Sequence, residues 1–221
     1  MNIKSLFKYT DKIFIFLIAI LLVISVYNLC FPRHVSKSYY ESTFEISQPY
    51  EQICKTLVLN DCSKYIVEKQ HGSLITSKWN RFNFGLRNSR GTLLSRVSAK
   101  CSGNFSVYIN NDIIGKKLFF FDRQISIDKN FVIIDIELQE SGESLRKYIS
   151  RIILIRGFST TEVKTSVYIE YSKIIPITHK RYMNKQVDDE AIKILSSLQS
   201  GLIEFLQNNK DSLFTIESKI K

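Results

Sequence analysis

Histidine is the side chain best suited to acid–base catalysis near neutral pH, and the sequence contains three. His34 follows a long apolar segment, His71 lies in a His-Gly-Ser turn, and His179 lies in a polar stretch near the C-terminus. Nucleophilic catalysis needs a serine or cysteine beside such a base, and none of these surroundings indicates one. We therefore expect all three imidazoles to be solvent-exposed. Because HExxH, GxSxG and glycine-rich phosphate motifs are absent, metalloprotease, α/β-hydrolase and nucleotide-binding activities have no support.

Paired carboxylates are the next candidates for catalysis, because two of them on one face can perform general acid–base chemistry. Asp135 and Glu137 share one face of a strand-like segment whose opposite face is wholly apolar. The apolar face predicts the core side, so we expect both carboxylates in solvent, facing Arg151 or Arg156. Asp122 and Arg123 interrupt another apolar strand, and one of these two must point inward or towards an edge of the sheet.

Aromatic residues give the better indication of a ligand-binding space. Trp79, Phe82 and Phe84 fall close together in a segment that also carries arginines, and Phe119 and Phe121 share a face with Lys117 and Arg123. Such groups suit a hydrophobic cavity whose basic mouth meets an acidic head group. Ordinary core packing explains the same residues, so both interpretations stay open.

Four cysteines limit the metal and redox chemistry. Cys54, Cys62 and Cys101 have no CxxC spacing, so zinc binding is not indicated, and Cys30 lies at the end of an apolar segment. We expect the first three thiols to be free and buried; one disulfide among them is the alternative if the domain is extracytoplasmic.

The N-terminal segment Ile13–Phe31 contains nineteen residues without a charge. As a helix it would be about 28 Å long, close to the thickness of about 30 Å of a bilayer core. We interpret it as an uncleaved transmembrane anchor; a signal peptide and a buried core helix are the alternatives. Lys4, Lys8 and Lys12 before the segment place the N-terminus in the cytoplasm and the domain outside it.

Net charge favours a membrane partner over nucleic acid. The chain carries +10, of which the N-terminal tail with its three lysines and one aspartate supplies +2, leaving +8 beyond. A tethered basic domain is attracted to anionic lipid head groups, although a lysine-rich composition also serves solubility. No basic cluster interleaves with aromatics, so we expect no nucleic-acid binding.

The remaining chain reads as strands between two helices. Alternation predicts a first strand over 38–46; Ser47 and Pro49 then suit the start of a short helix that ends near Asn60-Asp61. Period-two patterns predict strands over 65–69, 74–79, 92–101, 105–109, 117–127, 131–140, 150–158 and 161–175. A polar segment, 178–187, then leads to an amphipathic helix over Asp188–Gln207. Its apolar face is formed by Ala191, Leu195, Leu198, Leu202, Phe205 and Leu206.

These patterns predict an α+β fold in which a curved antiparallel sheet is covered by the C-terminal helix. The order resembles the helix-grip fold of the START-like superfamily, which includes Bet v 1-like proteins and polyketide cyclases. The resemblance is carried by YESTFEIS running into QPYEQICKTL and by VDDEAIKILSSLQSGLIEFL. It implies a hydrophobic ligand between the sheet and the last helix, with no shared catalytic residues.

The sequence therefore favours a membrane-anchored domain that binds a hydrophobic or lipid-like ligand, with no cofactor. An interaction or assembly subunit of a membrane complex is the alternative; a cyclase-type enzyme is less favoured. The expected divisions are a basic tail (1–12), the anchor (13–31), a linker (32–37), the START-like domain (38–207) and a C-terminal tail (208–221). The expected ligand-binding residues are Trp79, Phe82, Phe84, Tyr108, Phe119, Phe121, Leu195, Leu198, Leu202 and Phe205.

Overall fold

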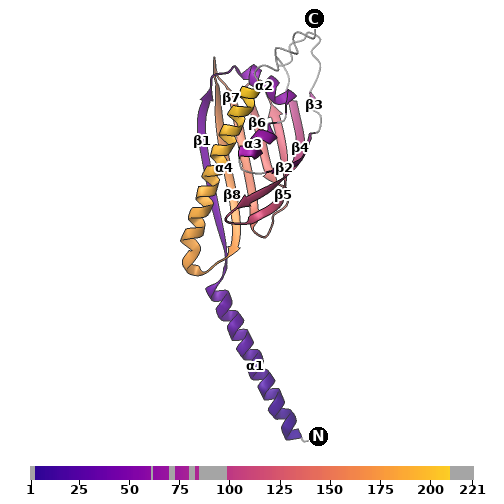
Figure 1. Cartoon of the computed structure of the whole chain (residues 1–221), viewed down its shortest axis with the longest axis vertical. Coiled ribbons are helices and arrows are strands. Elements are labelled where there is room, and N and C mark those ends of the chain that lie inside the picture. Colours follow the sequence, from indigo (N-terminus) through magenta and orange to yellow (C-terminus); the bar gives the residue numbers. More distant parts are fainter. Residues whose placement is uncertain (1–2, 61, 70–72, 80–82, 85–98, 210–221) are drawn as a thin grey trace.

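A computed structural model describes residues 3–60, 62–69, 73–79, 83–84 and 99–209. Its first element, α1 (Ile3–Cys30), extends away from the rest of the chain (Figure 1). Within α1, the stretch Ile13–Cys30 is long and apolar enough to cross a membrane, and none of it is buried against the domain. It agrees with the predicted segment to within one residue.

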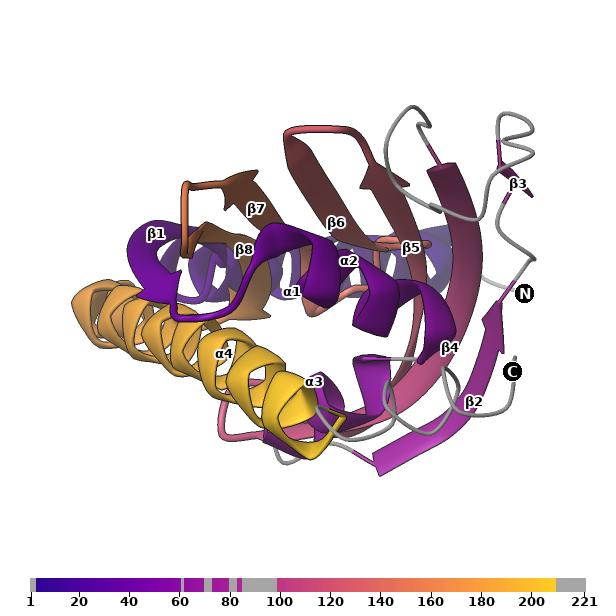
Figure 2. The ribbon, with the colours of Figure 1, turned by 90° about the horizontal axis from the view of Figure 1, so that it is seen from above.

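The remainder forms one curved antiparallel sheet with helices on its concave side (Figure 2). The strands lie in the order β1-β8-β7-β6-β5-β4-β2, and β3 also pairs with β4. Their bounds are β1 (Arg33–Ile46), β2 (Ser73–Trp79), β3 (Asn83–Phe84), β4 (Ala99–Asn111), β5 (Gly115–Ile127), β6 (Phe131–Leu138), β7 (Leu145–Arg156) and β8 (Thr161–Ile174). The helices are α2 (Tyr50–Leu59), α3 (Ser63–Lys69), a 3-10 turn η1 (Ile177–His179) and α4 (Lys180–Asn208). The predicted helix-grip class is confirmed.

Alternation along the strands decides which side chains enter the core. In β5 the odd-numbered residues from Phe119 to Ile127 are buried, and the even-numbered ones face outward. In β6, Val132, Ile134 and Ile136 are buried in the same way. Because side chains in a strand point alternately to opposite faces, each strand presents one apolar side to the concave space.

The long helix α4 covers that concave side, as predicted, with Leu198, Leu202 and Phe205 fully buried and Leu195 nearly so. Helix α4 begins earlier than the predicted start at Asp188, because the segment 178–187, predicted to be a polar connection, forms part of η1 and the first turns of the helix. Met183 and Val187 are buried there. They continue the four-residue spacing towards Ala191, which explains the longer helix.

Three other boundaries also differ from the predictions. Most of the predicted linker 32–37 belongs to β1, because β1 pairs with β8 from Arg33 onward. The predicted strand 65–69 is helix α3, and the predicted break between the strands 92–101 and 105–109 lies inside the continuous strand β4. Ser47 provides no cap; Pro49 occupies that position of α2 without a side-chain bond. The predicted strand 92–98 and the turn at His71 lie outside the described residues.

Candidate functional site

The aromatic core of the concave face is a connected series of rings on β4, β5 and β7. The rings of Phe105 and Phe121 stack with centroids 5.2 Å apart, and the ring of Tyr148 meets Phe121 edge-on at 5.2 Å. All three side chains are at most 5% exposed. We call Arg123, Phe105, Phe121 and Tyr148 the aromatic track. The antiparallel register places Phe105 beside Phe121 across β4 and β5, whereas Tyr148 reaches Phe121 from β7, beyond the intervening strand β6.

Arg123 forms one end of this track. It is the inward-facing member of the Asp122-Arg123 pair, at 2% exposure, while Asp122 faces solvent and accepts a hydrogen bond from Gln139 at 2.6 Å. The Arg123 guanidinium carbon lies 5.7 Å from the centroid of the Phe105 ring, a cation–π arrangement. Its partner across the sheet is Gly103, which has no side chain. Burying a guanidinium costs free energy, so a charge here is unusual for a site that only fills a core.

A narrow crevice between α4 and the sheet lies at the other end of the track. Its volume is about 20 Å³, enough for about one water molecule. It is lined by Val107, Ile109, Tyr148, Tyr171, Glu190, Lys193, Ile194 and Ser197. Tyr148 therefore belongs both to the crevice and to the aromatic track.

Polar groups converge at this crevice. Asn111 donates hydrogen bonds to the Tyr171 hydroxyl at 3.1 Å and to a Glu190 carboxylate oxygen at 3.0 Å. Burial, with a smaller contribution from the nearby charge of Glu190, raises the pKa of Tyr171 well above its usual range. The hydroxyl is therefore neutral at physiological pH and keeps a proton to donate.

The predicted ligand-binding residues divide into three groups in the structure. Phe119, Phe121 and the α4 residues Leu195, Leu198, Leu202 and Phe205 are all buried on the concave side. Tyr108 does not join them: it is 38% exposed, and the amine of Lys116 lies 5.1 Å from its ring. Trp79 and Phe84 lie in described strands, but their side chains, like the whole of Phe82, lie outside the described residues.

The contact of α4 with α3 was missed by the sequence analysis. The ring of Phe205 meets that of Tyr65 at 5.6 Å, and the Ser197 hydroxyl donates to the Lys69 carbonyl at 3.2 Å. A Cβ added at Gly201 would lie 2.8 Å from the Cα of Ile66, so only glycine permits this close approach. Part of the predicted ligand-facing stripe of α4 is thus occupied by a helix.

Three further residues of the site were also missed, namely Phe105, Tyr148 and Tyr171. Phe105 has the same parity as Cys101 along β4, and Tyr171 shares a face with Val163 and Val167, so strand alternation contains the signal for both. Tyr148 sits in the part of β7 that precedes the predicted strand start at residue 150. Its position followed only from the observed pairing of Tyr148 with Ile169 on β8.

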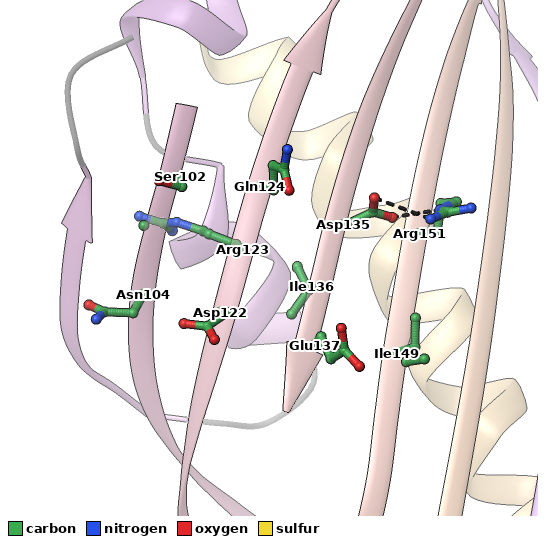
Figure 3. A pocket seen from close by; sticks show the side chains of 11 residues that line it. Ser102, Asn104, Asp122, Arg123, Gln124, Asp135, Ile136, Glu137, Ile149 and Arg151 are labelled. Atoms are coloured by element: carbon green, nitrogen blue, oxygen red, sulfur yellow. Dashed lines mark hydrogen bonds and ion pairs between the residues drawn. The ribbon is translucent and has the colours of Figure 1, made fainter. Parts of the chain in front are cut away.

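The outer face of the sheet carries a polar hollow of about 490 Å³, whose lining also includes Arg123 and its neighbour Gly103 (Figure 3). Asp135 accepts two hydrogen bonds from Arg151, at 2.6 and 3.2 Å, which confirms the predicted pairing of these side chains. The bond and charge of Asp135 raise the pKa of Arg151 above its usual value. Glu137 is also exposed, as expected. Among the described residues, no group of three His, Cys, Asp or Glu side chains is arranged to hold a metal ion.

The two remaining histidines and the cysteines lie outside any catalytic arrangement in the described chain. His179 is exposed, whereas His34 is partly buried and its Nε2 lies 2.9 Å from the Asn184 amide oxygen. Cys54, Cys62 and Cys101 are buried as free thiols. Burial raises the pKa of the Cys54 thiol to about 11, which makes it a poor nucleophile at neutral pH.

Neither a known protein family nor a curated protein matches the chain. Among solved structures, it is similar to a START superfamily protein from Mycobacterium smegmatis, with 17% identity, a TM-score of 0.42, and coverage of 76% of this chain and 98% of that one. The Zhui aromatase/cyclase from Streptomyces sp. R1128 is 12% identical, with a TM-score of 0.41 and coverage of 76% of this chain and 93% of that one. A STAR-related lipid transfer protein fragment from Xanthomonas axonopodis is 11% identical, with a TM-score of 0.43 and coverage of 74% of this chain and 85% of that one.

At these identities and TM-scores no function passes from the similar structures to this chain. The strand order and the covering helix of this chain define the helix-grip arrangement on their own, so the START-like resemblance inferred from the sequence is confirmed at the level of fold.

Proposed function

We propose that this protein is a membrane-tethered helix-grip domain that binds an apolar, lipid-like ligand carrying an acidic group. The observation that carries the proposal is the buried guanidinium of Arg123 at one end of the aromatic track. Rings along the track suit an apolar chain, and a guanidinium forms two parallel hydrogen bonds with a carboxylate or phosphate. An apolar surface that ends in a basic group therefore matches a ligand whose apolar chain ends in an acidic group.

Access for the ligand would lie at the crevice between α4 and the sheet. The crevice touches Tyr148, the last ring of the aromatic track, and its rim carries Lys193 and Glu190. The buried side chains of the track themselves fill the space between the sheet and α4. Binding therefore requires α4 to move away from β4 and the rings to change rotamer, which fits a lid-like role for the helix.

Lipid retained by the purified full-length protein tests this proposal. The protein is extracted in a mild detergent, and bound lipids are identified by native mass spectrometry. Arg123→Met should lose acidic lipids, and Arg123→Lys should keep part of the binding because it retains the charge. Arg151→Met is the matched control, since Arg151 lies on the outer face. Equal lipid content in the Arg123→Met and Arg151→Met variants, or none in the parent, would overturn the proposal.

The tether is the second part of the proposal. Helix α1 crosses the bilayer, with the N-terminus in the cytoplasm and the folded domain outside it. Lys4, Lys8 and Lys12 before the span support this orientation. Protease added to intact cells should remove the domain if it lies outside; protection until the cells are opened would reverse the orientation.

A role as an assembly subunit is the second candidate function. The small size of the crevice, about 20 Å³, favours it, because a core filled by its own side chains needs no ligand. Chemical cross-linking in native membranes distinguishes the two: a single stoichiometric protein partner, together with lipid-free protein, would support the subunit role.

A further inference from the structure

The end of the domain nearest α1 is formed by two short segments, 31–34 and 173–182, which we call the basal surface. The first joins α1 to β1, and the second joins β8 to α4 (Figure 1). Together they contain no aspartate or glutamate. Their basic side chains are Arg33, Lys173, Lys180 and Arg181, and their exposed large apolar side chains are Phe31, Ile174, Ile177 and Tyr182.

Backbone contacts make these two segments one surface. Arg33 pairs with Ile174 in the sheet, and the amide of Ile175 donates to the Pro32 carbonyl at 3.4 Å. The contact of His34 with Asn184, at 2.9 Å, ties the same corner to α4. The basic and apolar side chains of the basal surface are therefore held together by the fold.

The exit of α1 fixes how far the basal surface can lie from a membrane. Helix α1 ends at Cys30 and β1 begins at Arg33, so only Phe31 and Pro32 separate them. Two residues span about 7 Å even when fully extended. The head-group layer on each side of a bilayer core is about 5–8 Å thick. A domain that begins within this distance has its base at the head groups.

The composition of the basal surface matches the chemistry of that layer. Ile174, Ile177 and Tyr182 are each more than half exposed, which is unusual for large apolar side chains clustered on a water-facing surface. Tyrosine is enriched at the membrane interface, and the rings of Tyr27 and Phe31 stack 5.0 Å apart where α1 ends. Lysine and arginine extend their charges towards lipid phosphates while their stems cover apolar surface.

We infer that the basal surface docks onto anionic phospholipid head groups and holds the domain upright on the bilayer. This inference rests on the proposed membrane insertion of α1 and adds a second, charge-dependent contact to it. The loop between β6 and β7, with Glu140 and Glu143, lies beside β8, where the amide of Ser172 donates to the carbonyl of Ser144 at 2.7 Å. The contacting corner is the one formed by β1, β8 and the start of α4, which lies nearest α1 (Figure 1).

Docking would hold the candidate ligand site in a constant orientation to the membrane. The crevice lies along the same helix α4 whose first turn contributes Lys180, Arg181 and Tyr182 to the basal surface. A helix fixed at its first turn on the head groups can move mainly at its other end.

Fluorescence quenching by bromine-labelled lipid tests the docking on the full-length protein in nanodiscs. The discs contain phosphatidylcholine alone or have a third of it replaced by phosphatidylglycerol. Tyr182→Trp reports on the basal surface, and Phe158→Trp, on the exposed β7–β8 turn at the opposite end, is the matched reporter. Trp79 contributes the same background to both. We expect stronger quenching at position 182 than at 158, and a further increase with phosphatidylglycerol.

Charge reversal then tests the electrostatic part. Each basic residue near an anionic surface favours the docked state about five-fold. Lys180→Glu combined with Arg181→Glu should therefore lower the docked-to-free ratio by more than ten-fold. Both changes suit the first turn of a helix, where negative charge is favourable, so α4 should remain folded. Lys129→Glu combined with Lys164→Glu, away from α1, gives the same charge change and should leave quenching unaltered.

The outcomes separate docking from tethering. If alkaline washing removes the protein from lipid vesicles, α1 does not anchor it, and both the proposed tether and the docking are overturned. If the protein is retained but positions 182 and 158 are quenched equally, only the docking is overturned. Equal effects of the two double reversals would likewise exclude a specific basal contact.

Discussion

The two long helices, α1 and α4, are nearly equal in length, at 28 and 29 residues, yet they are solvated in opposite ways. The segment Ile13–Cys30 of α1 is strongly apolar, and none of it is buried against the domain. Helix α4 is apolar along one stripe, and that stripe is buried against the sheet and α3. The distribution of apolar side chains around a helix, more than their number, thus decides whether the domain buries it.

The largest effect is expected from removing the deepest ring of the α4 stripe. Phe205 is fully buried, and Phe205→Ala should lower the free energy of unfolding of the domain by about 3–5 kcal/mol. Chemical unfolding of detergent-solubilised protein measures this loss. Ile203→Ala, at a 37% exposed position of the same helix, should change it by less than about 0.5 kcal/mol. Similar losses in both variants would mean that the stripe does not define the buried face.

The converse experiment places a charge in α1. Leu21 lies near the middle of the span, and Leu21→Arg should make insertion less favourable by about 2.5–3.5 kcal/mol. Membrane fractionation should then show most of the protein outside the bilayer, with an unchanged unfolding temperature for the domain. Leu21→Ile is the control. Normal membrane retention of the Leu21→Arg variant would contradict the proposed insertion of α1 into lipid. A destabilised domain in this variant would show that α1, like α4, supports the folded domain.

A third test concerns the close packing of α3 against α4 at Gly201. An added side chain at Gly201 would collide with the backbone of Ile66, so Gly201→Val should cost about 1–3 kcal/mol of stability through overpacking. Ser200→Val, on the exposed neighbouring position, controls for the lower helix propensity of valine. Thermal unfolding compares the two. An equal cost at both positions would show that α3 does not pack tightly on α4.

The smallest effect is expected from ionisation of the Cys54 thiol, which is buried in the domain, whereas Cys30 of α1 is exposed. Burial raises the pKa of Cys54 to about 11, above its unfolded value of about 8.5. The protonated Cys54 thiol therefore contributes fully to the free energy of unfolding below its pKa in the unfolded chain. This contribution is lost as the pH rises towards the pKa in the folded protein, because in that range only the unfolded chain ionises the thiol.

Between pH 8 and 10, the parent should therefore lose about 1–2 kcal/mol more stability than Cys54→Ala. Unfolding titrations at these two pH values measure the difference. Cys30→Ala serves as the control and should follow the parent. A parent and a Cys54→Ala variant with parallel pH profiles would contradict the buried, protonated thiol.

The residues that were predicted correctly are those whose position depends on local periodicity. Alternation placed Val132, Ile134 and Ile136 on the core face, and the spacing of Leu195, Leu198 and Leu202 placed α4 over the sheet. The same local patterns predicted that one of Asp122 and Arg123 points inward or towards an edge, but not which, because both interrupt the strand equally.

The errors arise where a distant contact decides the structure. Tyr65, Ile66 and Val67 have high strand propensity, yet they form α3 because the backbone there packs against Gly201, far along the chain. The extra length of β1 likewise depends on pairing with β8, which sequence periodicity cannot show. Tyr148 was missed for the same reason, since its face of β7 is set by the register with β8.

The pairing of β1 with β8 also dictates when the domain can fold during synthesis. β1 directly follows α1, but its only partner along the sheet edge, among the described strands, emerges more than a hundred residues later. Until then the nascent chain presents an unpaired edge, and such edges recruit other strands. Closure is a late, long-range step, so slow translation or truncation before Ile174 should favour aggregation over folding.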